Sequence, residues 1–230
     1  ATMCEEMHIK FIGPSAEIMD KMGDKINARA EMIAANVPVI PGSDGEVFTA
    51  EQALEVAEKL GYPVMLKASA GGGGKGIRKV ESAQDLVPAF ESASQEALAA
   101  FGNGAMYIEK VVYPARHIEV QILGDSYGNV VHLGERDCSL QRNNQKVLEE
   151  SPSIAIGKTL RGKIGDAAVR AAKAVGYENA GTIEFLLDEK TSQFYFMEMN
   201  TRVQVEHPVT EFVTGVDIVK EQIRIAAGQE

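Results

Sequence analysis

The stretch that decides the fold is PVMLKASAGGGGKGIRKV, residues 63–80, in which a glycine-rich loop separates two runs typical of strands. A P-loop requires the pattern GxxxxGK[ST], but Ser69 occupies its first glycine position and a glycine follows Lys75. A GxGxxG spacing begins at Gly71, yet that dinucleotide-binding motif must open a helix, and GIRKV is typical of a strand. The loop is therefore predicted to join the two strands of a hairpin.

Such a hairpin has two interpretations, which these residues alone leave open. Glycine runs cost backbone entropy on folding, so a compact domain needs a reason to keep one. The bare N–H groups of the loop are suited to closing over a polyphosphate, as a kinase glycine-rich loop does, and Lys67 would add a positive charge. The alternative is a loose surface hairpin beside a solvated lysine.

Composition excludes several classes of protein. The chain has 230 residues and a formal net charge of -10, so its surface repels a phosphate backbone and nucleic acid is not an expected partner. Cys4 and Cys138 lie far apart without metal-ligand spacing, which favours a reduced, cytoplasmic protein. No apolar run is long enough to span a membrane, and none resembles a secretion signal, so no membrane association is expected.

The order of the predicted elements favours an α+β fold built from hairpins rather than alternating βα units. The best-marked helix is TAEQALEVAEKLG, where Thr49 and Gln52 form a capping box and Gly61 ends the helix. Asp24 is a second expected cap. Further helices are expected at 15–22, 24–37, from 82, at 158–175 and at 216–228, and strands at 8–15, 63–69, 77–80, 105–112, 116–125, 129–135, 180–188 and 193–200.

The last predicted hairpin places two carboxylates opposite each other. Side chains alternate along a strand, so Glu184 is expected on the face of Thr182 and Leu186. Glu198 is likewise expected to share a face with Phe194, Phe196 and Asn200. If residue 188 pairs with 194, then Glu184 pairs with Glu198 among apolar neighbours.

Two facing carboxylates destabilise a sheet unless something neutralises them. A hard divalent cation would do so, and Glu184, Glu198 and Asn200 offer the oxygen ligands that Mg²⁺ or Mn²⁺ prefers. The alternatives are a solvent-facing polar stripe or a register that keeps the glutamates apart. The metal site is favoured, because a charge on an apolar strand face needs a partner.

The polar pattern continues beyond this strand into TRVQVEHPVTE. If the chain stays extended, Arg202, Gln204 and Glu206 alternate onto one side. A guanidinium, an amide and a carboxylate together are suited to holding and deprotonating a small anion. Without a metal beside it, a polar strand end exposed to water is an equally natural interpretation.

These motifs together resemble the biotin carboxylases of the ATP-grasp superfamily. The resemblance rests on MGDK, KASAGGGGKGIRKV, IEKVVYPARHIEVQ, GERDCSLQRNNQKVLEESP, GTIEFL and FMEMNTRVQVEHPVTE, which occur in order along nearly the whole chain. It implies an ATP-grasp fold of two α+β subdomains with nucleotide between them and a glycine-rich hairpin lid. Residues 1–40 would be the remnant of an N-terminal subdomain with linking helices, 41–112 the lid subdomain and 113–230 the catalytic subdomain, incomplete at its C-terminus.

The resemblance also implies roles for individual residues. Hydrogencarbonate would be held by Lys146, Arg202, Gln204 and Val205, and Glu206 would take its proton. Metal ions would be bound by Glu184, Glu198 and Asn200. Contacts to ATP would come from Lys25, Lys67, Gly73, Gly74, Glu109, Lys110, Val111, Val112, His117, Gln141, Asn144, Glu184 and Glu198. Asn144 departs from the histidine that many relatives carry.

The implied reaction is that of a ligase. Hydrogencarbonate would attack the γ-phosphate of ATP, with two Mg²⁺ or Mn²⁺ ions, and the resulting carboxyphosphate would supply CO₂ to biotin on a carrier protein. A carboxyltransferase component and a homodimeric parent enzyme, for example in fatty acid biosynthesis, are further implications. The chain begins and ends early relative to the family, so one alternative is an excised ATP/Mg²⁺-binding module without turnover. Another is a carbamoyl phosphate synthetase, which VQVEHPVTE argues against.

Overall fold

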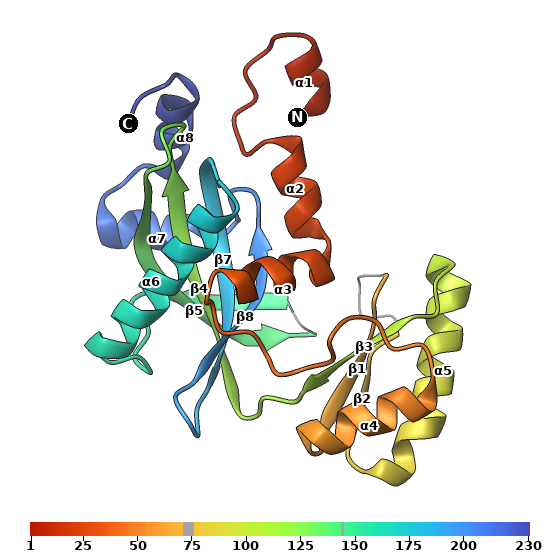
Figure 1. The fold of residues 1–230 in the computed structure, drawn as a ribbon. Coiled ribbons are helices and arrows are strands. Elements are labelled where there is room, and N and C mark those ends of the chain that lie inside the picture. Colours follow the sequence, from red (N-terminus) through yellow and green to blue (C-terminus); the bar gives the residue numbers. More distant parts are fainter. Residues whose placement is uncertain (71–75, 144) are drawn as a thin grey trace. The chain divides into compact units, whose positions relative to one another are not determined.

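The computed structural model describes residues 1–70, 76–143 and 145–230, which divide into two compact units (Figure 1). The larger unit contains residues 1–39 and 114–230, and the smaller unit contains residues 40–113. Each unit combines helices with an antiparallel sheet, which confirms the predicted α+β class. Among the described residues, no helix has the length and apolar character needed to cross a membrane.

The smaller unit is a three-stranded sheet packed against two helices. The strands β1 (Val64–Ala68), β2 (Arg78–Val80) and β3 (Met106–Lys110) are antiparallel in the order β2-β1-β3. The helices α4 (Ala50–Leu60) and α5 (Ala83–Phe101) contribute buried apolar residues to the same core as β1 and β3. The two strands within residues 63–80, β1 and β2, are therefore paired with each other, as predicted.

Local signals in this unit act as the sequence predicts. The Thr49 hydroxyl accepts a hydrogen bond from the backbone N–H of Gln52, and the Gln52 side chain accepts one from the backbone N–H of Thr49 (3.3 Å each). Gly61 ends α4 with φ of 71°, a conformation that L-residues with side chains rarely adopt. The capping box and the glycine stop are thus confirmed.

The larger unit contains a five-stranded antiparallel sheet in the order β6-β5-β4-β7-β8. Its strands are β4 (Ala115–Gly124), β5 (Val130–Arg142), β6 (Gln145–Glu150), β7 (Asn179–Asp188) and β8 (Phe194–Asn200). Its helices are α1 (Thr2–Glu6), α2 (Ala16–Gly23), α3 (Lys25–Ala34), α6 (Lys158–Ala174), α7 (His207–Thr214) and α8 (Ile218–Ala226).

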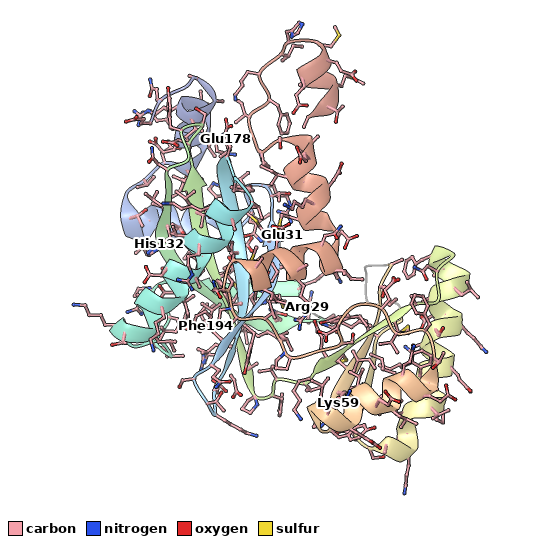
Figure 2. The ribbon with its side chains drawn as sticks, viewed as in Figure 1. Arg29, Glu31, Lys59, His132, Glu178 and Phe194 are labelled. Carbon is pink, nitrogen blue, oxygen red and sulfur yellow. The ribbon has the colours of Figure 1, made fainter. Side chains whose placement is uncertain are left out.

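Helices α3 and α6 cover one face of this sheet, and α7 lies on the other face (Figure 1). The covered face is apolar, and Ile118, Val120 and Ile122 of β4 point into its core. Helix α6 comes close to β5 at Gly165, where an added Cβ would lie 2.7 Å from Nε2 of His132, which Figure 2 labels. Asp24 caps α3 as predicted, accepting two backbone N–H groups.

A β-bulge in β8 changes which side chains share a face. Glu184 pairs with Glu198, but Phe185 pairs with Phe196, so Met197 is an extra residue in β8. The bulge sends Phe194 and Phe196 into the apolar core, while Glu198 lines the opposite face. The expected pairing of Glu184 with Glu198 is therefore confirmed, but the register of 188 with 194 from which it was predicted is wrong, because Leu187 pairs with Phe194. The expectation that Glu198 shares a face with both phenylalanines is also wrong.

Two further expectations of extended structure are wrong. Residues 8–15 form no strand, and no described strand pairs with them; Ile9, for example, is 60% exposed. A strand needs a neighbour to satisfy its backbone groups. The extension expected beyond β8 also ends at Asn200, because residues 201–206 turn into α7, a helix that the sequence did not indicate.

Candidate active site

The polar face of the five-stranded sheet opens into a cleft of about 960 Å³ that lies wholly within the larger unit. Predicted site residues that line it are His117, Gln141, Lys146, Glu184, Glu198, Asn200, Arg202, Gln204, Val205 and Glu206. The chain is not extended at 202–206, so its turn into α7, rather than strand alternation, brings those residues to the cleft.

Strand alternation explains how the sheet presents these side chains. Ile118 and Val120 of β4 point into the apolar core, so Glu119 between them points to the polar face. Glu119 pairs with Glu184 of the neighbouring β7, which in turn pairs with Glu198 of β8. Three carboxylates thus lie in a row across adjacent strands. Like charges placed so close need a cation between them.

Lys146 of β6 supplies that positive charge. Its ammonium donates to Glu119, to Oε1 of Glu184 at 2.8 Å and to Oε1 of Glu206 at 2.6 Å. Burial alone would lower the pKa of Lys146, but the attraction of Glu119 and these hydrogen bonds raise it above its ordinary value. Burial likewise opposes ionisation of Glu206, but Lys146 lowers the pKa of that carboxyl. Lys146 is therefore charged and Glu206 ionised near neutral pH.

Glu184 is buried in the cleft, with 3% of its surface exposed, and accepts several hydrogen bonds there. Its Oε1 accepts from Lys146, from Nδ2 of Asn200 (2.8 Å) and from Nε2 of Gln204 (3.1 Å). Burial acts to raise its pKa, but nearby His117 and Lys146 outweigh burial and lower the pKa to about 2. The expected apolar surroundings of this carboxylate are therefore wrong, because cationic and amide groups surround it.

His117 and Gln141, both predicted to contact nucleotide, lie against each other. Nε2 of Gln141 is 3.0 Å from Nδ1 of His117, so an amide N–H donates to that ring nitrogen and leaves the proton on Nε2. Nε2 of His117 lies 2.8 Å from Oε2 of Glu184, but it makes no aligned hydrogen bond within the described part of the chain. His117 therefore lies between Gln141 and Glu184 at the cleft wall.

The outer part of the cleft is open to solvent. Glu198 is exposed, and no hydrogen bond or ion pair of its side chain occurs among the described residues. Arg202 is also exposed, with Nη2 3.4 Å from Oδ1 of Asn200. Val205 is 91% exposed, so it does not serve as core packing. The inner cleft is therefore neutralised by the protein itself, and the outer cleft presents unpaired charge.

Arg136 and Glu119 complete the site and were assigned no role from the sequence. Arg136 of β5 is fully buried and donates to Glu119 at 2.5 Å. The signal that could have found Glu119 is its place in RHIEVQ, where polar residues alternate with buried isoleucine and valine. No comparable signal marks Arg136, because arginine is ordinarily a surface residue.

The smaller unit holds several other predicted nucleotide contacts. Lys67 of β1 forms an ion pair with Glu109 of β3. The Lys110 ammonium donates to the backbone carbonyls of Gly61 (2.6 Å) and Tyr62 (3.2 Å), and so holds the end of α4. The remaining predicted contacts lie elsewhere: Val111 and Val112 directly follow β3, Lys25 is exposed at the start of α3 in the larger unit, and Gly73, Gly74 and Asn144 lie outside the described residues.

Comparison with protein families gives a match to the carbamoyl-phosphate synthase L chain, ATP binding domain, over residues 24–230. The biotin carboxylase of Nostoc sp. is 60% identical over 229 residues, covering 100% of this chain and 51% of the relative. The biotin carboxylase 1 of Bacillus subtilis is 55% identical with the same coverage. The chain thus spans about half the length of these curated relatives.

Solved structures give the same result. A biotin carboxylase–β,γ-ATP complex from Campylobacter jejuni matches with a TM-score of 0.92 and 55% identity, covering 100% of this chain and 51% of that one. The biotin carboxylase domain dimer of Hydrogenobacter thermophilus 2-oxoglutarate carboxylase, solved with MgADP, ADP and bicarbonate, matches with a TM-score of 0.91. It is 54% identical, with the same coverage. These matches confirm the predicted ATP-grasp fold.

Proposed function

The chain belongs to the ATP-grasp family of the carbamoyl-phosphate synthase L chain ATP-binding domain, matching biotin carboxylases along its whole length, and we propose that it catalyses ATP- and hydrogencarbonate-dependent carboxylation of biotin. The observation that carries this proposal is the single cleft that gathers an ionised carboxylate, an ammonium, a guanidinium and open oxygen ligands. The biotin would be borne by a carrier protein and serve a carboxyltransferase component. The active form would be a homodimer, by analogy with the domain dimer of the Hydrogenobacter thermophilus enzyme.

Residues where the inner and outer parts of the cleft meet fit a divalent cation. Glu184, Glu198 and Asn200 offer oxygen atoms from two adjacent strands, and the exposed Glu198 carboxylate has no partner of its own in the described part of the chain. We assign these three residues to Mg²⁺ or Mn²⁺. The metal, when bound, would offset the charge that develops on the phosphate oxygens of ATP. His117 and Gln141 would contact the nucleotide from β4 and β5.

Hydrogencarbonate would bind between the inner and outer cleft. Lys146, Arg202 and Gln204 would hold its oxygens, and the exposed Val205 would lie against it. Ionised Glu206 would accept its proton. An oxygen of the anion would then attack the γ-phosphorus of ATP, the bond to ADP would break, and carboxyphosphate would form. Carboxyphosphate would release CO₂ and phosphate, and the deprotonated ureido nitrogen of biotin would attack CO₂.

In this proposal the smaller unit, predicted as residues 41–112, would act as the lid over ATP. Lys67, with Gly73 and Gly74 beyond the described residues, would contact the phosphates, and Lys25 would do so from α3. The segment from Glu109 to Val112 would line the adenine. Because Lys67 is paired with Glu109, nucleotide binding would exchange this ion pair for contacts to ATP. Residues 113–230 would form the catalytic part and 1–40 a connecting part.

The test is ADP release by the chain with Mg²⁺ and ATP, first without hydrogencarbonate, then with it, and then with free biotin added. Stimulation by both substrates is the expected result. ATP binding without stimulated turnover would instead support a nucleotide-binding module that needs the remaining half of its relatives' length. Stimulation by hydrogencarbonate and an ammonia source, but not by biotin, would favour carbamoyl phosphate synthesis.

A substitution tests the assignment of the base. Glu206→Gln keeps the size of the side chain but cannot accept the proton, so we expect ATP affinity within about twofold of wild type and loss of hydrogencarbonate-dependent turnover by roughly 100-fold. Glu221→Gln, on α8 and outside the cleft, is the control and should behave as wild type. Turnover that survives in Glu206→Gln would refute the role of this carboxylate.

A further inference from the structure

Arg136 is enclosed by polar groups of the larger unit on every side. It is fully buried, and its Nε donates to Glu119 at 2.5 Å. Its Nη1 donates to Gln121 and to Thr210, at 2.8 Å each. Its Nη2 lies 3.4 Å from the hydroxyl of Thr182 and 3.3 Å from Oε1 of Gln204. A guanidinium has five N–H groups, and each of them has a partner here.

These partners come from parts of the chain that the cleft must hold together. Glu119 and Gln121 lie on β4, and Thr182 lies on β7. Thr210 lies on α7, and Gln204 lies in the turn that leads into this helix. One rigid side chain therefore links two strands of the sheet to the segment that carries the proposed hydrogencarbonate contacts. Lysine could not replace it, because an ammonium is smaller and has three donors.

The surroundings of Gln204 dictate the orientation of its amide. On one side lies the Arg136 guanidinium, which can only donate hydrogen bonds. On the other side lies Oε1 of Glu184, which already accepts from Lys146 and from Nδ2 of Asn200 and lies 3.1 Å from Nε2 of Gln204. The amide oxygen must therefore face Arg136, and the NH₂ group must face Glu184 and the cleft. The reversed amide would place donor against donor and acceptor against acceptor.

We propose that Arg136 is a positioning residue that locks the Gln204 amide with its NH₂ group toward the cleft, where it donates to a small oxyanion. One N–H of this group is taken by Glu184, and the second, which has no partner among the described residues, would donate to the anion. The role of that anion as hydrogencarbonate in turnover rests on the proposed function. The locked amide itself follows from the contacts of Arg136 and Glu184 alone. Arg136 does not touch the anion and acts through Gln204.

Binding of sodium hydrogencarbonate gives the first test. In the ¹⁵N-labelled 230-residue chain, the side-chain NH₂ signal of Gln204, assigned by its loss in Gln204→Glu, should shift and saturate as hydrogencarbonate is added. Arg136→Lys should weaken this affinity at least tenfold. Thr210→Val removes one anchor of Arg136 and should weaken it about threefold. The control Arg161→Lys alters an arginine that pairs with Glu135 outside the cleft lining and should leave the affinity unchanged.

Kinetics give the second test, with a readout that simple loss of stability would not produce. Arg136→Lys should raise the KM for hydrogencarbonate at least tenfold while the KM for ATP stays within about twofold of wild type. The proposal would be overturned if a folded Arg136→Lys or Thr210→Val bound hydrogencarbonate with wild-type affinity. It would also be overturned if the Gln204 NH₂ signal of the wild type did not shift when hydrogencarbonate is added. If the signal responds but ADP release is never stimulated, the proposed function fails and the role of Arg136 stands.

Discussion

The two faces of the five-stranded sheet are built from the same strands, but one face is an apolar core and the other carries charged side chains. In β4, Ile118, Val120 and Ile122 point into an apolar core, while His117 and Glu119 point to the cleft. The apolar face is stabilised by removing hydrocarbon from water. The polar face carries carboxylates whose charges are neutralised by Lys146 and Arg136. Such an arrangement contributes little net stability, which implies that it is kept for chemistry.

The polar face itself divides into an inner and an outer part. Inside, Glu119 and Glu184 are buried and their charges are satisfied by the protein. Outside, Glu198 and Arg202 are exposed and Val205 has almost no packing. A buried network holds its members in fixed positions, whereas exposed groups are free to change partners. We infer that the inner part positions the catalytic groups and the outer part binds what enters.

The largest expected effect comes from breaking the apolar face. Phe185 is fully buried and its ring meets that of Phe194 edge to face at 5.5 Å. Phe185→Ala should lower the free energy of unfolding by about 3–5 kcal/mol, measured by urea denaturation. Leu186→Ala, the next residue but on the cleft side, is the matched control and should cost clearly less. Equal losses would show that the two faces do not differ as described.

A second effect sharpens the comparison through the pH dependence of the inner cleft. The pKa of Glu184 is lowered from 4.5 to about 2 in the folded protein, so its contribution to stability is complete above 4.5 and is lost as pH falls toward 2. Without metal, the stability advantage of wild type over Glu184→Gln should therefore shrink by roughly 2 kcal/mol between about pH 6 and pH 3. The exposed Glu6→Gln should show little change over this range. A constant difference for Glu184→Gln would contradict the account.

The smallest effect on stability is expected in the outer cleft. Because Val205 is 91% exposed, Val205→Ser should change the free energy of unfolding by less than about 0.5 kcal/mol. The same substitution should weaken hydrogencarbonate binding, followed by the Gln204 side-chain NH₂ signal, by roughly two- to fivefold, because it removes apolar contact with the anion's site. A loss of stability without a loss of hydrogencarbonate affinity would show that Val205 contributes to packing and not to binding.

Local patterns in the sequence predicted the parts of this arrangement that depend on neighbouring residues. Thr49 and Gln52 lie three positions apart, so their capping box is visible before folding. The pairing of Glu184 with Glu198 is expected from a register of 188 with 194, whereas the structure pairs Leu187 with Phe194 and reaches the same glutamate pair through the bulge. Such features need only the period of a helix or strand and the chemistry of a turn.

Features that depend on distant parts of the chain could not be predicted in this way. The bulge at Met197 places Phe196 and Glu198 on opposite faces, and no residue type in the sequence indicates it. Arg136 is buried only because β4, β7 and α7 surround it after folding. Residues 8–15 have the composition of a strand but no described partner. Tertiary contacts decide all three.

The most direct test of the central claim, that the open half of the polar face binds metal and nucleotide, is calorimetric titration of ATP into wild type and Glu198→Gln with and without Mg²⁺. Glu189→Gln, on the connection between β7 and β8 and outside the cleft lining, is the matched control. We expect Mg²⁺-dependent binding that Glu198→Gln weakens about tenfold, a loss of roughly 1.4 kcal/mol, with unfolding free energy unchanged. Equal ATP affinity in wild type and Glu198→Gln would contradict the claim.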